Sequence, residues 1–199
     1  MYKPSNNSFN SLVERFKYLK DLPTYIMVKD KNSTIAAISH NMAILIGWNN
    51  SKQAISKTDY EIPCKASENA ENFINEDLIV FRTGQPTLRA YVCDYSQGWK
   101  VMMGTKNPIK NKYGKTIGIL GQGLDITDTD TGKRFWYLHQ SNYKFQNDKL
   151  KSVNYVLDRN NCTLPLSSRQ QECVFLMIRG KAYKEIAYIL NISERTIES

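Results

Sequence analysis

The sequence predicts an α+β protein, in which an antiparallel sheet with flanking helices is followed by a connecting helix and a small all-α domain. Three observations predict this class. Between Leu22 and Thr127, short β-rich runs surround one clearly helical block. After them, residues 133–157 are helix-forming and contain no Gly or Pro. Residues 164–199 space their caps and apolar positions as short helices joined by a tight turn.

Composition is typical of a folded globular chain. The 199 residues leave room for one large domain or two small ones. Hydrophobic residues make up 41% and charged residues 23%, which argues against a collagen-like, low-complexity or disordered chain. We expect four regions: an amino-terminal helical extension at 1–21, a mixed helix-and-sheet domain at 22–127, a connecting helix and linker at 128–163, and a terminal helical domain at 164–199.

The compartment follows from what the sequence lacks. The longest stretch without charged side chains, 32–51, is interrupted by Ser39, His40 and Asn41, which a bilayer would have to desolvate. The first ten residues have no apolar run of the kind that a secretory signal needs. No CxxC pair occurs among the cysteines, which are Cys64, Cys93, Cys162 and Cys173. We therefore expect a reducing cytoplasm and no membrane span.

The net charge of +8, from 27 Lys and Arg against 19 Asp and Glu, favours a polyanionic partner such as DNA, RNA or an anionic membrane. One basic cluster comprises Lys100, Lys106, Lys110, Lys112 and Lys115, and a second comprises Lys133, Arg134, Lys144, Lys149 and Lys151. For these two clusters we favour a solvated basic face, since lysines at turns keep strand edges soluble, and a polyanion-binding surface is the alternative.

The first half begins with two extended runs. Residues 24–30 and 34–39, separated by the polar turn KNS, predict a β-hairpin. Residues 40–48 then have the apolar spacing of a short helix. After the main helix, three further extended segments are expected at 87–95, 99–109 and 116–127. The predicted order is β-β-α-α-β-β-β.

The main helix of this half is expected within residues 67–86. Ser67 can cap its start, acidic residues crowd its first turns, and Gly84 followed by Pro86 ends it. Its predicted apolar face consists of Phe73, Ile74, Leu78 and Phe81.

The segment after Thr127 predicts a connecting helix over 133–157, followed by a linker at 158–166. A seven-residue recurrence is formed by Trp136, Tyr143, Leu150 and Leu157. The intervening core positions are largely polar, as at His139 and Gln146. A coiled coil and a single amphipathic helix packed on the first domain both remain open.

The last segment predicts three helices. The first is capped by Ser167 or Ser168 and closed by Gly180. The second begins near Tyr183 or Lys184 and buries Ile186, Ala187 and Leu190. The turn and the cap of a third helix are formed by Asn191, Ile192 and Ser193. A helix, a short turn and a second helix is the arrangement that places the latter in a DNA major groove.

The capping residues, Gly180 and the small Ala187, which lets another helix cross closely, follow one pattern. It is made by Ser167, Arg169, Glu172, Gly180, Lys184-Glu185-Ile186-Ala187, Leu190, Ile192-Ser193 and Thr196-Ile197. The pattern resembles the helix-turn-helix of LuxR-type transcription regulators over the whole of 164–199. One departure is Gln170, where the family usually has Glu. The third helix would have only six residues here, about 9 Å, whereas the family's recognition helix continues, so we expect the chain to be cut short.

The resemblance implies a set of DNA-contacting residues. Lys184 and Thr196 would contact phosphates, and Glu198 and Ser199 would lie at the groove-facing start of the recognition helix. The whole implied set is Lys184, Ser193, Arg195, Thr196, Glu198 and Ser199. The net charge of 164–199 is only +1, from five basic and four acidic residues. A small helical cap without a DNA role is the alternative interpretation.

Residues 22–127 contain several short motifs in addition to this order of elements. They are Asn41 and Gly47, the stretch SKTDYEIP at 56–63, Pro108 and Gly114, and Asp125-Ile126-Thr127. The region resembles a PAS sensory domain, although Ser56 stands where glycine is usual. An antiparallel sheet with helices over one face leaves room for a small ligand or for a packed core. The candidate pocket residues are Tyr91, Cys93, Trp99, Met102 and Met103, which ordinary core packing would explain equally.

No flavin, haem or metal signature is present, and the ligand remains unidentified. Cys64 lies in IPCKAS rather than in the Asn-Cys-Arg motif of flavin photosensors. Only His40 and His139 could ligate haem, and a capping or surface role suits His40 better. His and Cys never cluster at the spacing of metal ligands.

Catalysis is not expected. The GKT at 114–116 lacks the preceding glycine-rich loop of a phosphate-binding site, and neither GxSxG nor HExxH occurs. The sequence instead predicts a cytoplasmic, dimeric transcription regulator whose PAS domain receives a small-molecule or protein signal and controls the helix-turn-helix. The alternative is a PAS interaction or dimerisation module that does not bind DNA. A reading frame continuing past Ser199 with basic and apolar residues at helical spacing would favour the regulator.

Overall fold

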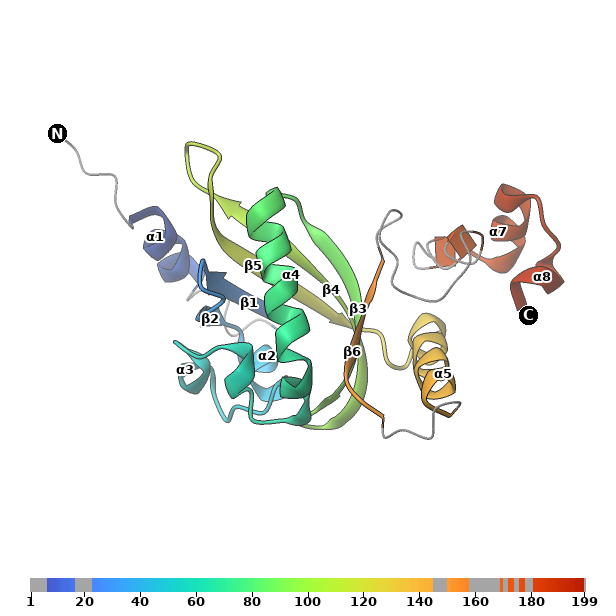
Figure 1. Ribbon diagram of the computed structural model, residues 1–199, viewed down its shortest axis with the longest axis horizontal. Helices are drawn as coiled ribbons and strands as arrows, with labels where there is room; N and C mark the ends of the chain where they lie inside the picture. Colours follow the sequence, from blue (N-terminus) through green and yellow to red (C-terminus); the bar gives the residue numbers. More distant parts are fainter. Residues whose placement is uncertain are drawn as a thin grey trace.

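A six-stranded antiparallel sheet forms the centre of the computed structural model (Figure 1). The structure describes residues 7–16, 23–144, 150–157, 169, 172–173, 176–177 and 181–198. The strands are β1 (Tyr25–Asp30), β2 (Ile35–Ile38), β3 (Thr87–Tyr95), β4 (Gly98–Lys110), β5 (Thr116–Asp125) and β6 (Val153–Val156), in the order β2-β1-β5-β4-β3-β6. Helices contact both faces of the sheet, so the α+β prediction is confirmed.

The helices are distributed between the two faces. They are α1 (Asn7–Phe16), α2 (His40–Leu45), α3 (Ser51–Ala54), η1 (Asp59–Glu61), η2 (Lys65–Asn69), α4 (Ala70–Thr83), α5 (Asp130–Lys144), α7 (Tyr183–Leu190) and α8 (Glu194–Glu198). The segment from α2 to α4 covers one face, here named the inner face, and α1 and α5 pack on the other, the outer face. In Figure 1, α1 and the pair α7 and α8 lie at opposite ends of the molecule.

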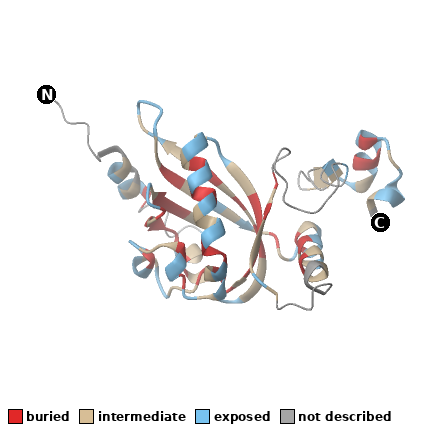
Figure 2. Ribbon diagram, in the orientation of Figure 1, coloured by how far each residue is buried: buried red, intermediate tan, exposed pale blue. Residues whose placement is uncertain are grey.

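Strand periodicity explains the separate cores. Because successive side chains point to opposite faces of a strand, Met27 contributes to the inner core and Val28 to the outer core under α1. On β4, Met102 belongs to the inner core and Val101 to the outer core under α5. The buried residues in Figure 2 accordingly lie along the sheet and on the helix sides that face it.

The predicted hairpin is observed as β1 and β2. The Asp30 carboxylate holds its turn by accepting hydrogen bonds from the backbone amides of Asn32 (2.8 Å) and Thr34 (3.0 Å). Ser56, where the PAS family usually has glycine, adopts a positive φ of 65°. That backbone conformation favours glycine, which accounts for the family's preference.

Helix α4 ends as predicted, since Gly84 adopts a φ of 62° at its carboxyl end. Its start and its buried face differ from the prediction. The hydroxyl of Ser67 lies in η2 and donates to the Cys64 carbonyl instead of capping α4. Leu78 is 48% exposed, and the buried residues of α4 are Ala70, Glu76, Asp77 and Val80. The predicted apolar face is right at Phe73, which packs against the inner core, and wrong at Leu78, because two carboxylates take inward positions instead.

The connecting segment is only partly helical. Helix α5 packs on the first domain, which agrees with the alternative of a single amphipathic helix, and it is described over Asp130–Lys144. Residues 153–156 instead form β6, which pairs with β3 so that Tyr155 lies opposite Ala90. The prediction of one helix to 157 was wrong, because the free edge of β3 offers backbone hydrogen bonds to a β-prone sequence. The predicted linker at 158–166 lies outside the described residues.

The terminal helices follow the prediction closely. Helix α7 begins at Tyr183 and buries Ile186, Ala187 and Leu190. Asn191 ends it with a φ of 50°. Ser193 caps α8, since its hydroxyl oxygen accepts a hydrogen bond from the Thr196 amide at 3.2 Å. The first predicted cap, at Ser167 or Ser168, lies outside the described residues.

Candidate ligand cavity and DNA-binding segment

A cavity of about 90 Å³ lies between the inner face of the sheet and the helices that cover it. Its wall is mainly apolar and includes Met27, Met42, Leu45, Ile46, Ile62, Phe73, Met102 and Ile119. Polar groups converge at one part of the wall, and they belong to Lys29, Asp59, Asp77, Tyr91 and Lys106. A largely apolar cavity with a few polar side chains is the usual construction of a small-molecule site.

The predicted pocket residues divide between the two faces. Tyr91 and Met102 line the cavity, and Cys93 belongs to the same core cluster without lining it. Trp99 and Met103 pack instead in the outer core against α5. Adjacent residues of a strand cannot share a face, so Met102 and Met103 could not both line one pocket. The expectation that Trp99 and Met103 line it is corrected.

Buried charges occupy the polar part of the cavity. The Lys29 ammonium donates to the carboxylates of Asp59 and, at 2.9 Å, of Asp77. The Lys106 ammonium donates to the other oxygen of Asp77 at 2.5 Å and to the Phe73 carbonyl at 2.7 Å. These contacts connect β1 and β4 to η1 and α4. The cavity's roof is therefore attached to the sheet by ion pairs.

The pKa values of Lys29 and Asp77 are shifted by their buried partners. Burial alone would lower the pKa of Lys29, but the carboxylates of Asp59 and Asp77 outweigh burial and raise it above its ordinary value. Burial likewise favours neutral Asp77, yet Lys29 and Lys106 hold its pKa below the ordinary 3.8. Lys29 and Asp77 are therefore both charged at neutral pH.

Glu76 extends the cluster toward β3. Its carboxylate accepts hydrogen bonds from the hydroxyls of Thr87 at 2.5 Å and Tyr91 at 2.8 Å. It also pairs with Arg89 at 3.4 Å and with Lys106 at 3.3 Å. Burial, with Glu76 nearby, raises the pKa of Tyr91 well above its usual value, so its hydroxyl stays protonated and donates.

The sequence analysis missed this cluster. Lys106 was assigned to a solvated basic face, but it is 9% exposed. A usable signal was present in α4, where Phe73, Asp77 and Val80 recur at the spacing of one helix face. Of the same basic cluster, Lys100 is partly buried and pairs with Asp125 at 2.7 Å.

The implied DNA-contacting residues gather at α7 and α8. Lys184 is exposed in the first turn of α7, and Arg195 and Thr196 are exposed on α8. The Thr196 hydroxyl lies 2.7 Å from that of Ser193. Glu198 is the last residue of α8, and Ser199 lies outside the described residues. Within that limit, the structure places these residues on neighbouring short elements.

Two contacts hold this helical segment together. The Arg169 guanidinium donates to the carbonyl of Leu190, which is a free acceptor at the end of α7. The Glu185 carboxylate accepts from the Ala182 amide at 3.0 Å and thereby caps the start of the same helix. Both ends of α7 are therefore fixed.

Two absences hold for the part of the chain that the structure describes. No group of three or more His, Cys, Asp or Glu side chains is arranged to hold a metal ion. None of its helices combines the length and apolar character needed to cross a bilayer.

The geometry defines a class of protein in which a PAS-type fold with a cavity precedes a helix-turn-helix. Residues 164–199 match the family described as bacterial regulatory proteins, luxR family. The chain is thus a PAS domain fused to a LuxR-type helix-turn-helix, and it is a DNA-binding transcription regulator.

Solved structures similar over nearly the whole chain agree with this class. A ligand–DNA complex of Vibrio cholerae VqmA is 28% identical, with a TM-score of 0.55, over 94% of this chain and 76% of that one. A Vibrio cholerae VqmA dimer solved without target DNA is 28% identical, with a TM-score of 0.54, over 93% and 76%. VqmA bound to DPO is 26% identical, with a TM-score of 0.53, over 94% and 74%. No curated protein matches the sequence.

Proposed function

We propose that the chain binds a small molecule in the cavity on the inner face and thereby controls DNA binding by the helix-turn-helix, as a cytoplasmic dimer. The observation that carries the proposal is the presence, in one chain, of a largely apolar cavity with convergent polar groups and a LuxR-type segment. Support comes from the similar VqmA structures, one bound to DPO, one in a ligand–DNA complex and one a dimer.

The cavity favours a small ligand without net charge. Three buried cations, Lys29, Arg89 and Lys106, face three buried anions, Asp59, Glu76 and Asp77. This balance leaves no uncompensated charge to attract an ion, and a charged ligand would be desolvated without a partner. A neutral molecule with an apolar body and a hydrogen-bonding group would suit both parts of the wall.

The DNA-facing residues follow from the family match and from exposure. Lys184 would contact a phosphate from the first turn of α7, and Ser193 would hold the start of α8 while Arg195 and Thr196 face the duplex. Glu198 and Ser199 complete the proposed set at the groove. A dimer would present two such units, so a ligand that changes dimer geometry would change their spacing.

The domain limits 21/22, 127/128 and 163/164 are part of the proposal, but β6 pairs with β3, so the sensory sheet also includes residues from the 128–163 segment. The proposal assigns no catalytic step to any residue. The competing function, a PAS interaction module without DNA binding, requires that the terminal helices serve only for docking.

Two measurements test the proposal. Native mass spectrometry of the freshly purified protein should show a retained small molecule, and a protein whose cavity is narrowed by Ile119→Trp should lose it. Binding of the full-length protein to labelled duplex DNA should weaken steeply as salt increases. Retention of no molecule would refute the sensory assignment, and a flat salt response would favour the interaction module.

A further inference from the structure

Arg134 on α5 contacts the helix-turn-helix unit. Its guanidinium carbon lies 4.2 Å from the centre of the Tyr183 ring, the first residue of α7. Its Nη1 atom lies 3.3 Å from the sulfur of Met177. A planar guanidinium over an aromatic ring is a favourable cation–π geometry. Residues 43 and 49 positions away in the sequence are thus brought together through one side chain.

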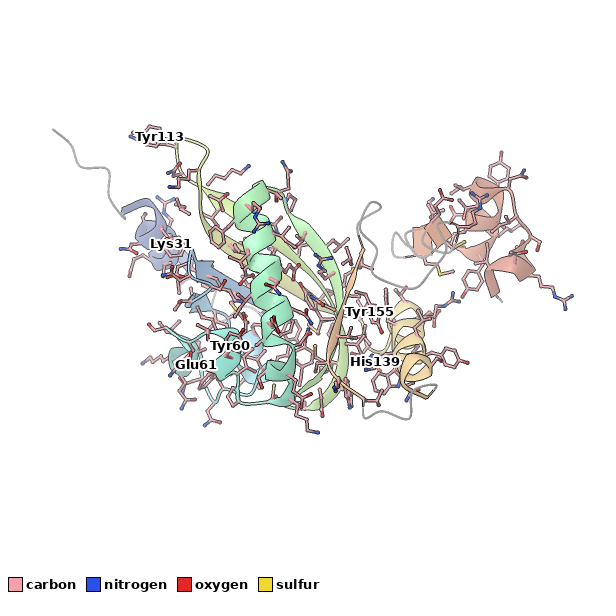
Figure 3. The ribbon with its side chains drawn as sticks, in the orientation of Figure 1. Lys31, Tyr60, Glu61, Tyr113, His139 and Tyr155 are labelled. Carbon is pink, nitrogen blue, oxygen red and sulfur yellow. The ribbon has the colours of Figure 1, made fainter. Side chains whose placement is uncertain are left out.

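Helix α5, which carries Arg134, is firmly attached to the sheet. Its neighbour Phe135 is 3% exposed in the outer core. Rings of Trp136 and His139 lie 5.5 Å and 5.2 Å from that of Trp99 on β4. Figure 3 shows His139 on α5 close to Tyr155 on β6, where the Tyr155 hydroxyl lies 3.4 Å from the imidazole Nδ1. Arg134 therefore projects from a helix with a fixed position on the outer face.

The strands beneath α5 are the same strands that line the cavity. On β3, Tyr91 faces the cavity, whereas Val92 belongs to the outer core under α5. On β4, Met102 faces the cavity and Val101 faces α5. A displacement of either strand by a ligand would change the surface on which α5 rests, because close-packed interfaces transmit small shifts.

We infer that Arg134 is a positioning residue: by contacting Tyr183 and Met177 it fixes the orientation of the helix-turn-helix relative to the sensory sheet. Lys184 follows Tyr183 directly, so this contact sets the direction in which the proposed phosphate-contacting residue faces. The inference rests on the proposed function for its significance, since only a DNA-binding segment gains from a defined orientation. The physical contact itself is tested separately.

Hydrogen exchange of the α7 amides in the full chain is the direct test. Arg134→Ala should accelerate exchange across 183–190 by about two- to five-fold, the effect of losing one exposed cation–π contact. Lys133→Ala is the matched control, because it removes the neighbouring exposed cation on the same helix. It should leave α7 exchange unchanged. Equal exchange in the wild-type and Arg134→Ala proteins would overturn the inference.

Ring and charge variants distinguish positioning from general packing. Tyr183→Phe keeps the aromatic face and should exchange like the wild type, whereas Tyr183→Leu should match Arg134→Ala. Arg134→Lys keeps the charge but loses the planar stack, so it should rescue only partly. A Tyr183→Phe protein as fast as Tyr183→Leu would contradict the inference.

A separate DNA-binding experiment distinguishes failure of the positioning contact from failure of the proposed function. Binding of the wild type to a fluorescein-labelled duplex of mixed sequence, measured across a salt series, tests the function alone. If the wild type fails to bind while Arg134→Ala still loosens α7, the positioning contact stands and the proposed function fails. If the wild type binds but α7 exchange does not respond to Arg134→Ala, the function stands and the positioning contact is refuted.

Discussion

The two faces of the sheet use opposite chemistry at alternate residues of the same strands. The inner face places four charged side chains, those of Lys29, Asp59, Asp77 and Lys106, in the wall of a cavity, whereas the outer face packs aromatic and aliphatic side chains against α5. On the outer face, the buried His139 is flanked by Trp99 and Trp136. The difference shows how one strand can carry a polar recognition surface and a packing surface for a neighbouring helix at once.

The energetic basis of the two faces differs accordingly. Burial of apolar surface stabilises the outer face without directional requirements. On the inner face, ion pairing must offset a large desolvation cost, so the cluster contributes little net stability but is sensitive to loss of any member. This contrast predicts that the inner face responds most strongly to removal of a single charge.

Asp77→Ala should have the largest effect, because it leaves both Lys29 and Lys106 buried without this shared partner. We expect a loss of about 3 to 5 kcal/mol in the free energy of unfolding, measured by urea denaturation. Leu78→Ala, one position along α4 and 48% exposed, is the control and should change stability by less than about 0.5 kcal/mol. Similar values for both variants would remove the distinction between the faces.

The second-largest expected difference between the two faces is in how the free energy of unfolding depends on pH. Burial lowers the pKa of His139 to about 4, against an ordinary value of 6.5. The unfolded chain therefore binds more protons between these values, so stability is full above pH 6.5 and falls as the pH drops toward 4. The loss is about 3 kcal/mol at 1.36 kcal/mol per pKa unit. The Asp77 pKa lies below 3.8, so the inner face loses its contribution only at lower pH.

Urea denaturation across this pH range provides the check. His139→Leu should abolish the slope between pH 6.5 and 4, whereas His40→Ala, which removes the exposed histidine, should retain it. A slope that survives in His139→Leu would show that the outer face does not contain the group responsible.

Matched removal of one hydroxyl from each face should give the smallest effects. Tyr91→Phe deletes the donor to the buried Glu76 carboxylate at 2.8 Å and should cost about 1.5 to 3 kcal/mol. Tyr155→Phe deletes a hydroxyl 3.4 Å from His139 and should cost about 1 kcal/mol or less. Thermal unfolding of the two proteins would compare them directly, and a larger cost for Tyr155→Phe would reverse the proposed contrast.

Local patterns sufficed for much of the fold. The β1–β2 hairpin, the end of α4 at Gly84 and the turn at Asn191 each depend on residues adjacent in sequence. The face on which each side chain of β4 lies could also have been predicted, because strand alternation places Met102 and Met103 on opposite faces of the sheet. These elements were predictable because the signal and the structure share one short segment.

The missed features depend on distant partners. Lys29 is buried only because Asp59 and Asp77 lie 30 and 48 positions away, which a strand pattern does not reveal. Strand β6 forms because the edge of β3 is available to a β-prone segment, and the helix-forming residues that precede it in the sequence gave no sign of that distant edge. The pairing of the buried charges was therefore beyond local reasoning, although the inward position of Asp77 on α4 was not, and Tyr91 and Met102 were correctly predicted to line the cavity.

The central claim, that a cavity-bearing sensory domain controls a nucleic-acid reader, is tested most directly by the salt dependence of DNA binding in full-length wild-type and Lys184→Ala proteins. Fluorescence anisotropy should give a steep linear fall of log Kobs with log salt for the wild type, and Lys184→Ala should reduce that slope by about one. Identical slopes, or an absence of salt-dependent binding in the wild type, would contradict the account.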